Sequence, residues 1–454
     1  MDDYRGIADE IAASIADGRL RPGEQLPTQR AFARRHGIAG STAGRVYREL
    51  VRRGLVVGEV GRGTFVRAGR GTPGVALAEP AAAPVDLELN YPVVPEQSAL
   101  LATGLSPMLR ADALDAALRP VGAAGTAFAR ESFASLSSGA GAGGDTGAGA
   151  AWRARADDVL FAANGRQAVA AALSALVSPG QRLGVEALTY PVVKALAQRL
   201  GITLVPLPTD EHGLLPDALP AVHRATPLHA LYLQPRLHNP LGVTLAPERR
   251  EALADTVDRL GLPLVEDAIW SFLRPGAAPL AALAPEWTVL VDSLSKRAAP
   301  GLTTGWALVP ARLRASVTAA LRSGGWTPSG FALEAAVRWI GDGTLAAIEA
   351  AKRTDAAERQ RLARRILAGQ ALRSDPCSYY VWWELPPAWR AETFVAAAAR
   401  QGIAVTPAAA FAVDGRTSPS AVRVGLASPP LPVLAGALET LARTAAGTPE
   451  DLLC

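Results

Sequence analysis

Lysine is rare in this chain, and one lysine stands in a stretch that suggests chemistry arginine cannot perform. Lys296, in "VDSLSKRAAPGLTTGW" (291–306), is one of only three lysines, with Lys194 and Lys352. A guanidinium stays protonated and does not condense with aldehydes, whereas an amine with a lowered pKa can form a Schiff base. The alternative is an ordinary solvated lysine. Lys296 is therefore the first candidate for covalent chemistry.

The residues around Lys296 need a framework, and beyond residue 85 short apolar runs alternate with helical stretches. The runs include "RLGVE", "LHALYLQ", "LPLVED" and "WTVLVDS", and the helical stretches include "RQAVAAALSALV" and "PERREALADTVDRLG". This alternation predicts an α/β domain with a mainly parallel sheet. A later run, "CSYYVWWEL", and a final helix predict a small C-terminal subdomain from about residue 374.

The first 68 residues follow a different pattern of three short helices and a hairpin. Apolar residues at positions 7, 11 and 15 have helical spacing; Thr28 can cap a second helix that stops at Gly37; a third helix runs from Ser41 to Gly54. "LVVGEVGRGTFVR" then gives two β-prone runs around a Gly/Arg tip. The sequence predicts an α+β winged helix-turn-helix domain over 1–68.

Two segments lack periodicity and are predicted to connect rather than to pack. Residues 69–84 are rich in Gly, Pro and Ala and are expected to be a linker, so that the larger domain covers 85–454. "SLSSGAGAGGDTGAGAA" (135–151) is a low-complexity insert, expected to be a loop. No strand precedes it, which argues against a glycine-rich phosphate cradle.

The charge of the chain is concentrated at its N-terminus. Residues 1–70 contain 13 of the 46 basic and 8 of the 42 acidic residues, a net charge of +5, and the remainder has a net charge of −1. A small basic domain on a near-neutral body suggests that the first part meets a polyanion. A protein-docking module with a solvated basic face is the alternative.

Composition excludes several other classes of protein. Cys377 and Cys454 provide neither a disulfide framework nor metal-ligand spacing, and the five histidines form no HExxH-like cluster, so no metal is expected. No apolar run reaches membrane-spanning length, and "MDDYRGIADE" carries acids where a signal peptide carries bases. We expect a soluble, cytoplasmic protein.

These motifs together resemble a known family. "GRLRPGEQLPTQRAFARRHGI", "VYRELVRRGLV" and "GRGTFV" are similar to a GntR-type winged helix, and residues from about 85 to 445 resemble a fold-type I aminotransferase. The combination is that of the MocR-type regulators. The resemblance implies a dimer, with pyridoxal 5'-phosphate as the cofactor.

The resemblance assigns a role to each polar motif, because this cofactor needs partners for its aldehyde, ring and phosphate. Lys296 would hold the aldehyde, Asp267 the pyridine nitrogen and Asn239 the ring oxygen, and Tyr190 would stack on the ring. The implied phosphate ligands are Asn164, Gly165, Arg166, Gln167, Ser293, Ser295 and Arg297. Arg423 matches the arginine that grips an amino acid's carboxylate. In isolation, Asp267 could equally be a helix cap, Asn239 a turn residue and Arg423 a surface charge.

The sequence departs from the family pattern at two places. An arginine usually follows the lysine by seven residues and clamps the phosphate, but Thr303 stands there, and Arg166 or Arg297 is expected to replace it. A tyrosine usually follows the aspartate closely, but Ile269 and Trp270 are there instead. The ring oxygen therefore loses a donor, which makes a full transamination cycle a weaker expectation.

The resemblance also implies the residues that contact DNA. Arg30 opens the second helix; Ser41, Thr42 and Arg45 open the recognition helix; Arg62, Gly63 and Thr64 form the wing tip. Gly40 stands where the family often has a basic residue.

We expect a transcriptional regulator that binds an operator as a homodimer and senses an amine, an amino acid or the vitamin B6 cofactor at Lys296. The aminotransferase-like domain is expected to act as a sensor more than as a catalyst. Two alternatives remain. The protein could be an aminotransferase with a vestigial DNA-binding head, or a regulator whose site has lost the cofactor and takes another effector.

Overall fold

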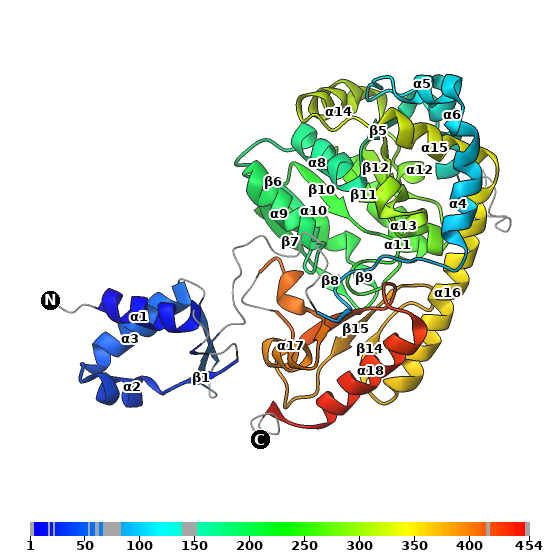
Figure 1. The fold of residues 1–454 in the computed structure, drawn as a ribbon. Coiled ribbons are helices and arrows are strands. Elements are labelled where there is room, and N and C mark those ends of the chain that lie inside the picture. Colours follow the sequence, from blue (N-terminus) through cyan, green and yellow to red (C-terminus); the bar gives the residue numbers. More distant parts are fainter. Residues whose placement is uncertain are drawn as a thin grey trace.

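The computed structural model describes residues 4–16, 19–20, 23–52, 55–59, 63–66, 83–138, 152–414 and 418–449. The chain forms a small N-terminal head and a larger body, which Figure 1 shows in blue and in the remaining colours. Nearly all of the predicted linker lies outside the described residues. No helix in the described part of the chain is long and apolar enough to cross a membrane.

The head has three helices and a three-stranded sheet of order β1-β3-β2. Its helices are α1 (Tyr4–Ala16), α2 (Gln29–His36) and α3 (Gly40–Arg52), and its strands are β1 (Gln25–Leu26), β2 (Val56–Glu59) and β3 (Gly63–Val66). The three helices and the β2–β3 hairpin confirm the predicted winged helix-turn-helix. Helix α3 begins one residue before the predicted Ser41, and β1 was not expected, because two residues are too short for a strand pattern.

Local sequence explains why the helices of the head begin and end as they do. The Thr28 hydroxyl accepts a hydrogen bond from the N–H of Ala31 (3.3 Å) and caps α2. Gly37 ends that helix with a φ of 63°, a left-handed conformation that favours glycine. Phe32, Val46 and Leu50 from α2 and α3 are buried in one apolar core.

The body is built on a seven-stranded sheet of order β5-β13-β12-β11-β10-β6-β7. All neighbouring pairs are parallel except those of β13, which runs antiparallel to both β12 and β5. The strands are β5 (Val159–Ala162), β6 (Arg182–Glu186), β7 (Thr203–Leu207), β10 (Ala230–Leu233), β11 (Leu264–Asp267), β12 (Thr288–Ser293) and β13 (Gly305–Leu308). The predicted mainly parallel α/β sheet is confirmed.

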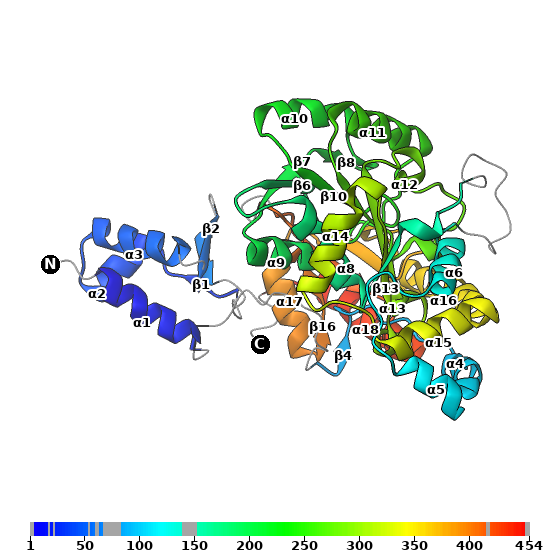
Figure 2. The ribbon, with the colours of Figure 1, turned by 90° about the horizontal axis from the view of Figure 1, so that it is seen from above.

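Helices cover both faces of this sheet, as Figures 1 and 2 show. One face packs against α8 (Gly165–Leu176), α9 (Pro191–Leu200) and α14 (Ala311–Ser323). The opposite face packs against α11 (Pro247–Leu260) and α12 (Leu280–Leu283) at one end and α6 (Ala127–Ser137) and α15 (Gly330–Gly341) at the other. The inner strands are buried on both faces, and their apolar runs make them recognisable in the sequence.

The remaining elements connect these layers. They are α4 (Gln97–Leu105), η1 (Ser106–Leu109), α5 (Ala111–Ala117), η2 (Ala156–Asp158), β8 (Thr209–Asp210), β9 (Gly213–Leu214), η3 (Pro216–Ala218), α10 (Leu219–Ala225), η4 (Ser271–Leu273), α13 (Leu294–Arg297) and η5 (Pro300–Leu302). Helix α6 takes up the first residues of the predicted insert, of which 139–151 lie outside the described residues.

A long helix, α16 (Thr344–Ile366), leads from the large domain into a small domain around an antiparallel sheet of order β14-β15-β18-β17. Its elements are β14 (Ala371–Arg373), β15 (Tyr380–Glu384), α17 (Ala391–Arg400), β16 (Ile403–Ala404), β17 (Thr406–Pro407), η6 (Ala408–Ala410), β18 (Ala421–Gly425) and α18 (Leu431–Ala446). Strand β4 (Val85–Asp86), from the start of the body, pairs with β16.

The small domain is larger than the predicted region beyond residue 374. Leu87, next to β4, and Ala363 on α16 are buried in its core. The boundary therefore falls inside a continuous helix and also takes in a distant segment, and neither feature leaves a break in the sequence pattern.

The head touches the small domain at the start of α17. The guanidinium carbon of Arg390 lies 4.7 Å from the centre of the Phe65 ring on β3. Gly23 lies against Thr393, because a Cβ at this position would be 2.7 Å from the Thr393 Cγ2. The hairpin of the head and the small domain therefore share a contact.

Gly305 on β13 allows the turn before α8 to lie against the sheet. A Cβ there would lie 2.3 Å from the carbonyl carbon of Asn164 and 2.8 Å from the N of Gly165. We predict that Gly305→Ala destabilises the protein by about 1–3 kcal/mol in chemical denaturation. Gly301→Ala is the matched control, because a Cβ at Gly301 meets nothing within 4 Å. Equal stability of the two variants would contradict this packing.

Candidate functional site

A cavity of about 780 Å³ lies at the carboxyl edge of the large sheet and reaches the small domain. Its walls come from the loops after β5, β6, β10, β11 and β12 and from β17 and β18. Ten of the residues assigned to the cofactor or effector line it: Asn164, Gly165, Arg166, Tyr190, Asn239, Asp267, Ser293, Ser295, Lys296 and Arg423. Parallel strands bring their carboxyl ends to one edge, which gathers residues far apart in the chain.

Lys296 projects into this cavity from α13, directly after β12. Its Nζ donates to the carbonyl of Asn90 (2.5 Å) and lies 4.5 Å from the ring centre of Tyr91 and 5.4 Å from that of Trp270. Burial, with smaller contributions from Arg166 and Arg423, lowers its pKa to about 7. The amine is thus poised to be neutral and nucleophilic near physiological pH, as the sequence analysis required.

Asp267 ends β11 on the floor of the cavity and is almost completely buried. Its Oδ2 accepts from the Tyr232 hydroxyl (2.5 Å) and the Gln234 Nε2 (3.0 Å), and its Oδ1 accepts from the N–H of Ile269 (3.1 Å). Burial raises the pKa of this carboxyl, and the three donors oppose that shift. A cationic ring nitrogen in the cavity would stabilise the charged carboxylate.

A cup of small polar groups lies between the start of α8 and α13. Asn164 caps α8, with its side chain accepting from the N–H of Gln167 (3.0 Å). The hydroxyls of Ser293 and Ser295 are 2.7 Å apart. A Cβ at Gly165 would lie 3.1 Å from Ser293, so glycine brings the helix start close to these hydroxyls. Free N–H groups at the first turn of a helix, next to hydroxyls, suit a phosphate.

Two of the predicted phosphate ligands do not face the cup. Gln167 does not line the cavity; its amide oxygen accepts from the Asn164 Nδ2 (3.1 Å), so it supports the cap instead. Arg297 points the other way, into a buried ion-pair network.

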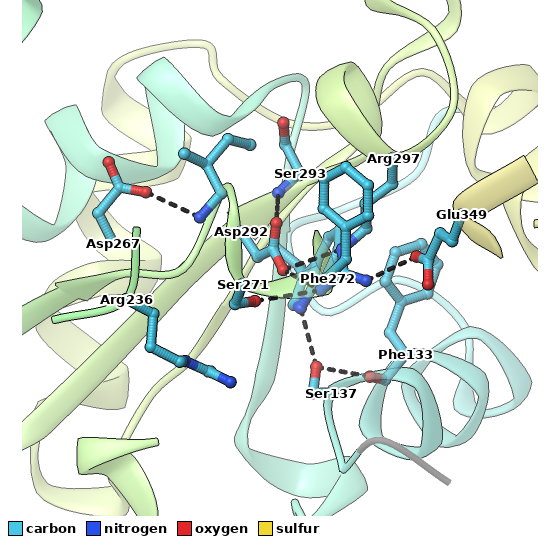
Figure 3. Close-up of polar contacts among 12 residues, drawn as sticks. Phe133, Ser137, Arg236, Asp267, Ser271, Phe272, Asp292, Ser293, Arg297 and Glu349 are labelled. Carbon is cyan, nitrogen blue, oxygen red and sulfur yellow. Dashed lines mark hydrogen bonds and ion pairs between the residues drawn. The ribbon is translucent and has the colours of Figure 1, made fainter. Parts of the chain in front are cut away.

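The expectation that Arg297 replaces the missing clamp is wrong. Its guanidinium donates to the Asp292 Oδ2 (2.7 Å) and to the Glu349 Oε1 (2.6 Å), and Figure 3 shows it enclosed by these carboxylates and the Phe272 ring. Burial alone would lower the pKa of Arg297, but the two carboxylates outweigh it and raise the pKa. Burial also raises the pKa of Asp292, to about 6, although Arg297 opposes this shift. The network anchors α13 rather than a ligand.

Arg166 is then the arginine left for the clamp, because it lines the cavity near the cup. It lies close enough to Tyr190 and Lys296 to influence the pKa of both. Thr303, where the family places its arginine, also lines the cavity, and among the described residues its buried hydroxyl has no hydrogen-bond partner. An unpartnered hydroxyl in this place fits a ligand oxygen.

Asn239 and Arg423 join the large and small domains across the cavity. The Arg423 NH1 donates to the Asn239 Oδ1 (3.0 Å), and its NH2 donates to the carbonyl of Glu88 and to the Thr406 hydroxyl (3.3 Å). Its Nε is buried and has no partner among the described residues. A guanidinium with an unpartnered N–H in the cavity wall suits a ligand carboxylate.

Several residues of the site were missed by sequence reasoning. Tyr232 and Gln234 position Asp267, and Lys352 donates from α16 to the carbonyls of Lys296 (2.9 Å) and Ala298 (2.6 Å). The rarity of lysine was the one signal for Lys352. Tyr232 is on β10 and Gln234 directly follows that strand, and the apolar run around them hid both.

The head places only some of its predicted DNA contacts at the surface. Arg30, Ser41 and Arg45 are exposed, whereas Thr42 is buried in the head and cannot reach a base, which corrects that prediction. Gly63 and Thr64 are on β3, and Arg62 lies outside the described residues.

Comparison with known proteins fits both halves of this description. Residues 148–441 match the family "aminotransferase class I and II", and residues 3–66 match "bacterial regulatory proteins, gntR family". The chain belongs to the class I and II aminotransferase family. Its N-terminal gntR domain gives it the MocR-type arrangement that the sequence resembles. Aminotransferases of this family depend on pyridoxal phosphate, which agrees with the predicted cofactor.

Individual proteins are similar to part or nearly all of this chain. The chain is 28% identical to the uncharacterized HTH-type transcriptional regulator YdeF of Bacillus subtilis, over 94% of this chain and 90% of YdeF. It is 34% identical to the HTH-type pyridoxine biosynthesis transcriptional regulator PdxR of Corynebacterium glutamicum, over 37% of this chain and 36% of PdxR. The fold resembles an archaeal alanine:glyoxylate aminotransferase (TM-score 0.71, 19% identity, 80% of this chain and 90% of the other).

The residues present fit pyridoxal phosphate. Lys296 would hold its aldehyde and Asp267 its ring nitrogen; Ser293, Ser295 and the start of α8 would hold its phosphate; the unpartnered Thr303 hydroxyl and Arg166 would replace the usual arginine. When bound, the cofactor supplies an electrophilic carbon for amines and a ring that accepts electrons.

Separate substitutions of Arg166 and Arg297 test this division of roles. Arg166→Ala should weaken cofactor binding, measured by absorbance titration, and leave the stability of the cofactor-free protein nearly unchanged. Arg297→Met should cost about 3–5 kcal/mol in denaturation, because it leaves Asp292 and Glu349 buried without their partner. Arg110→Met, at an exposed ion pair with Asp112, is the control and should change stability by at most about 1 kcal/mol. A stable Arg297→Met protein with lost cofactor affinity would reverse the assignment.

The lowered pKa of Lys296 predicts a pH profile. An amine attacks only when neutral, so the rate at which the protein captures pyridoxal phosphate should rise with a midpoint near pH 7 and level off above it. Borohydride trapping followed by peptide mapping measures this rate and should place the label on Lys296. A rate that keeps rising towards pH 10, or a label on Lys194 or Lys352, would contradict the assignment.

Proposed function

We propose that this protein is a DNA-binding transcriptional regulator that senses a small amine or amino acid, or pyridoxal phosphate itself, through the cofactor held at Lys296. The observation that carries the proposal is one chain with a gntR-type head and a body whose lysine, aspartate and arginines converge on one cavity. The names of YdeF and PdxR as HTH-type transcriptional regulators support it.

In the head, the exposed Arg30 and Arg45 suit contacts with DNA. Arg30 is in the first turn of α2. Arg45 is in the first half of α3, the helix that a winged helix-turn-helix domain places in the major groove. The proposed roles are a phosphate contact for Arg30 and a base contact for Arg45. The proposed location is the cytoplasm, because the protein would act on DNA.

In the body, the ligand acts by changing the balance between two arrangements of the domains. Arg423 on β18 belongs to the small domain and donates to Asn239 of the large domain, so a carboxylate bound by this guanidinium would change the link between the domains. A ligand with different affinity for the open and closed arrangements shifts their populations. Turnover is not needed for this effect.

The contact between Arg390 and Phe65 is the proposed route from the small domain to the head. Arg390 begins α17, which packs on the same core as β18, so movement of the small domain changes the support for β3. Residues of α17 and β18 share one apolar core, and this packing would carry a shift of β18 to the contact with the head.

The proposed assembly is a homodimer built by the body. Aminotransferase-like domains are typically dimeric. Apolar side chains are exposed at the end of η1, just after α5 and at the start of α6, on Leu109, Leu118 and Phe128. Covering such side chains removes apolar surface from water. A dimer would present two heads to two half-sites.

Operator titrations at several salt concentrations, with and without pyridoxal phosphate, test the proposal. Arg30→Ala should lower operator affinity and reduce the slope of log affinity against log salt by about 1. Arg45→Ala should cost about 1–3 kcal/mol of discrimination between operator and random DNA. Lys296→Ala should keep DNA binding near normal and lose its response to cofactor or effector.

Two outcomes would overturn this reading. If Arg30→Ala and Arg45→Ala bind DNA as the parent does, the head is not the DNA reader. If the parent converts amino acids to keto acids while its DNA binding ignores them, the protein is an aminotransferase with a vestigial head.

A further inference from the structure

Glu88 is a carboxylate on the wall of the cavity that the cofactor chemistry leaves unused. It follows Leu87, which is buried in the core of the small domain, and it lines the cavity together with Asn90 and Tyr91. Its N–H donates to the Asp86 Oδ1 (2.8 Å) and its carbonyl accepts from Arg423, so its main chain is fixed. The carboxylate itself has no hydrogen bond or ion pair within the described part of the chain.

The other carboxylates of the cavity have partners. Asp267 accepts from Tyr232 and Gln234, and Asp292 is paired with Arg297. Glu88 is instead half-buried without a pair, and burial first, with Asp86, raises its pKa while Arg423 opposes the shift. Partial burial of a carboxylate costs free energy unless a cation pairs with it. A positive group on the ligand would provide that partner for Glu88.

The position of Glu88 relative to Arg423 limits what the ligand can be. The Arg423 guanidinium donates to the carbonyl of Glu88, so the two residues are neighbours on one wall. Arg423 suits a carboxylate of the ligand, and Glu88 suits a cation. Aromatic rings also line the cavity: Tyr91 and Trp270 lie beside Lys296, and Phe411 lies beside Arg423. Such rings suit the methylene groups of a ligand. A ligand with a second carboxylate would be repelled by Glu88.

On the basis of the proposed function, we propose that the effector is a dibasic amino acid. Its carboxylate binds Arg423, its α-amine reaches the cofactor at Lys296, and the amino or guanidinium group of its aliphatic side chain pairs with Glu88. Glu88 is thus the residue that determines specificity.

The test titrates the full-length protein, loaded with pyridoxal phosphate, with L-lysine, L-ornithine, L-norleucine and L-glutamate. The readouts are the cofactor absorbance band and the operator affinity. The parent should bind lysine or ornithine at least about tenfold more tightly than norleucine, which has a similar chain without the cation, and glutamate most weakly. Glu88→Gln should bring the ratio of lysine to norleucine affinity close to one. Glu439→Gln, an exposed glutamate on α18, is the control and should keep the parent's ratio.

Three outcomes would overturn the inference. Equal binding of lysine and norleucine by the parent means that Glu88 selects no cation. An equal loss of both ligands in Glu88→Gln means that Glu88 only supports Arg423. Binding of neither dibasic amino acid to a protein that holds its cofactor on Lys296 excludes this class of effector. Failure to hold the cofactor at all would instead overturn the proposed function on which the inference rests.

Discussion

A buried arginine fixes the short helix that carries the reactive lysine. Helix α13 has four residues, too few to be stable alone, and it is held by the Arg297 guanidinium between Asp292 and Glu349 and by the Lys352 amine on its carbonyls. Arg297, Asp292 and Glu349 are buried charges, and each therefore needs its ion-pair partner. Because the anchors come from β12 and α16, the position of Lys296 depends on the packing of the large domain against the long helix. The site exists only where that packing is complete.

The second condition for the site is that two domains meet over the cavity. The large sheet supplies Lys296 and Asp267, while the small domain supplies Arg423, which already bonds to Asn239 on the other side. Lys194 on α9 adds a further link, because its amine donates to the carbonyls of Ala410 (2.8 Å) and Ala412 (2.7 Å) near η6. The same polar groups can thus bind a ligand and set the relation of the domains, which is what a sensor requires.

The head contributes recognition of DNA and little else to this arrangement. It has its own core and meets the body at the start of α17, where one aromatic ring lies against one guanidinium. Interfaces between domains of one chain resemble transient interfaces, so the placement of the head can change. Such a junction suits a head whose placement must respond to the body.

The sequence by itself determined the elements, and the tertiary structure decided their partners. Strands such as "WTVLVDS" and the Thr28 cap could be predicted, because apolar runs and caps are local properties. Lys296, Asp267 and Asn239 could be placed in one site through the motifs of the family. The direction of Arg297 could not, since an arginine beside the lysine can face the ligand or the core, and only Glu349, 52 residues away on α16, draws it inward. The burial of Thr42 in the head could not be predicted from the sequence either. Nor could the contact of Glu88 with Arg423, which requires β4 to pair with β16 of the small domain. Local spacing determines the position of a residue on its helix or strand. The burial and the charges contributed by distant segments decide which way its side chain points.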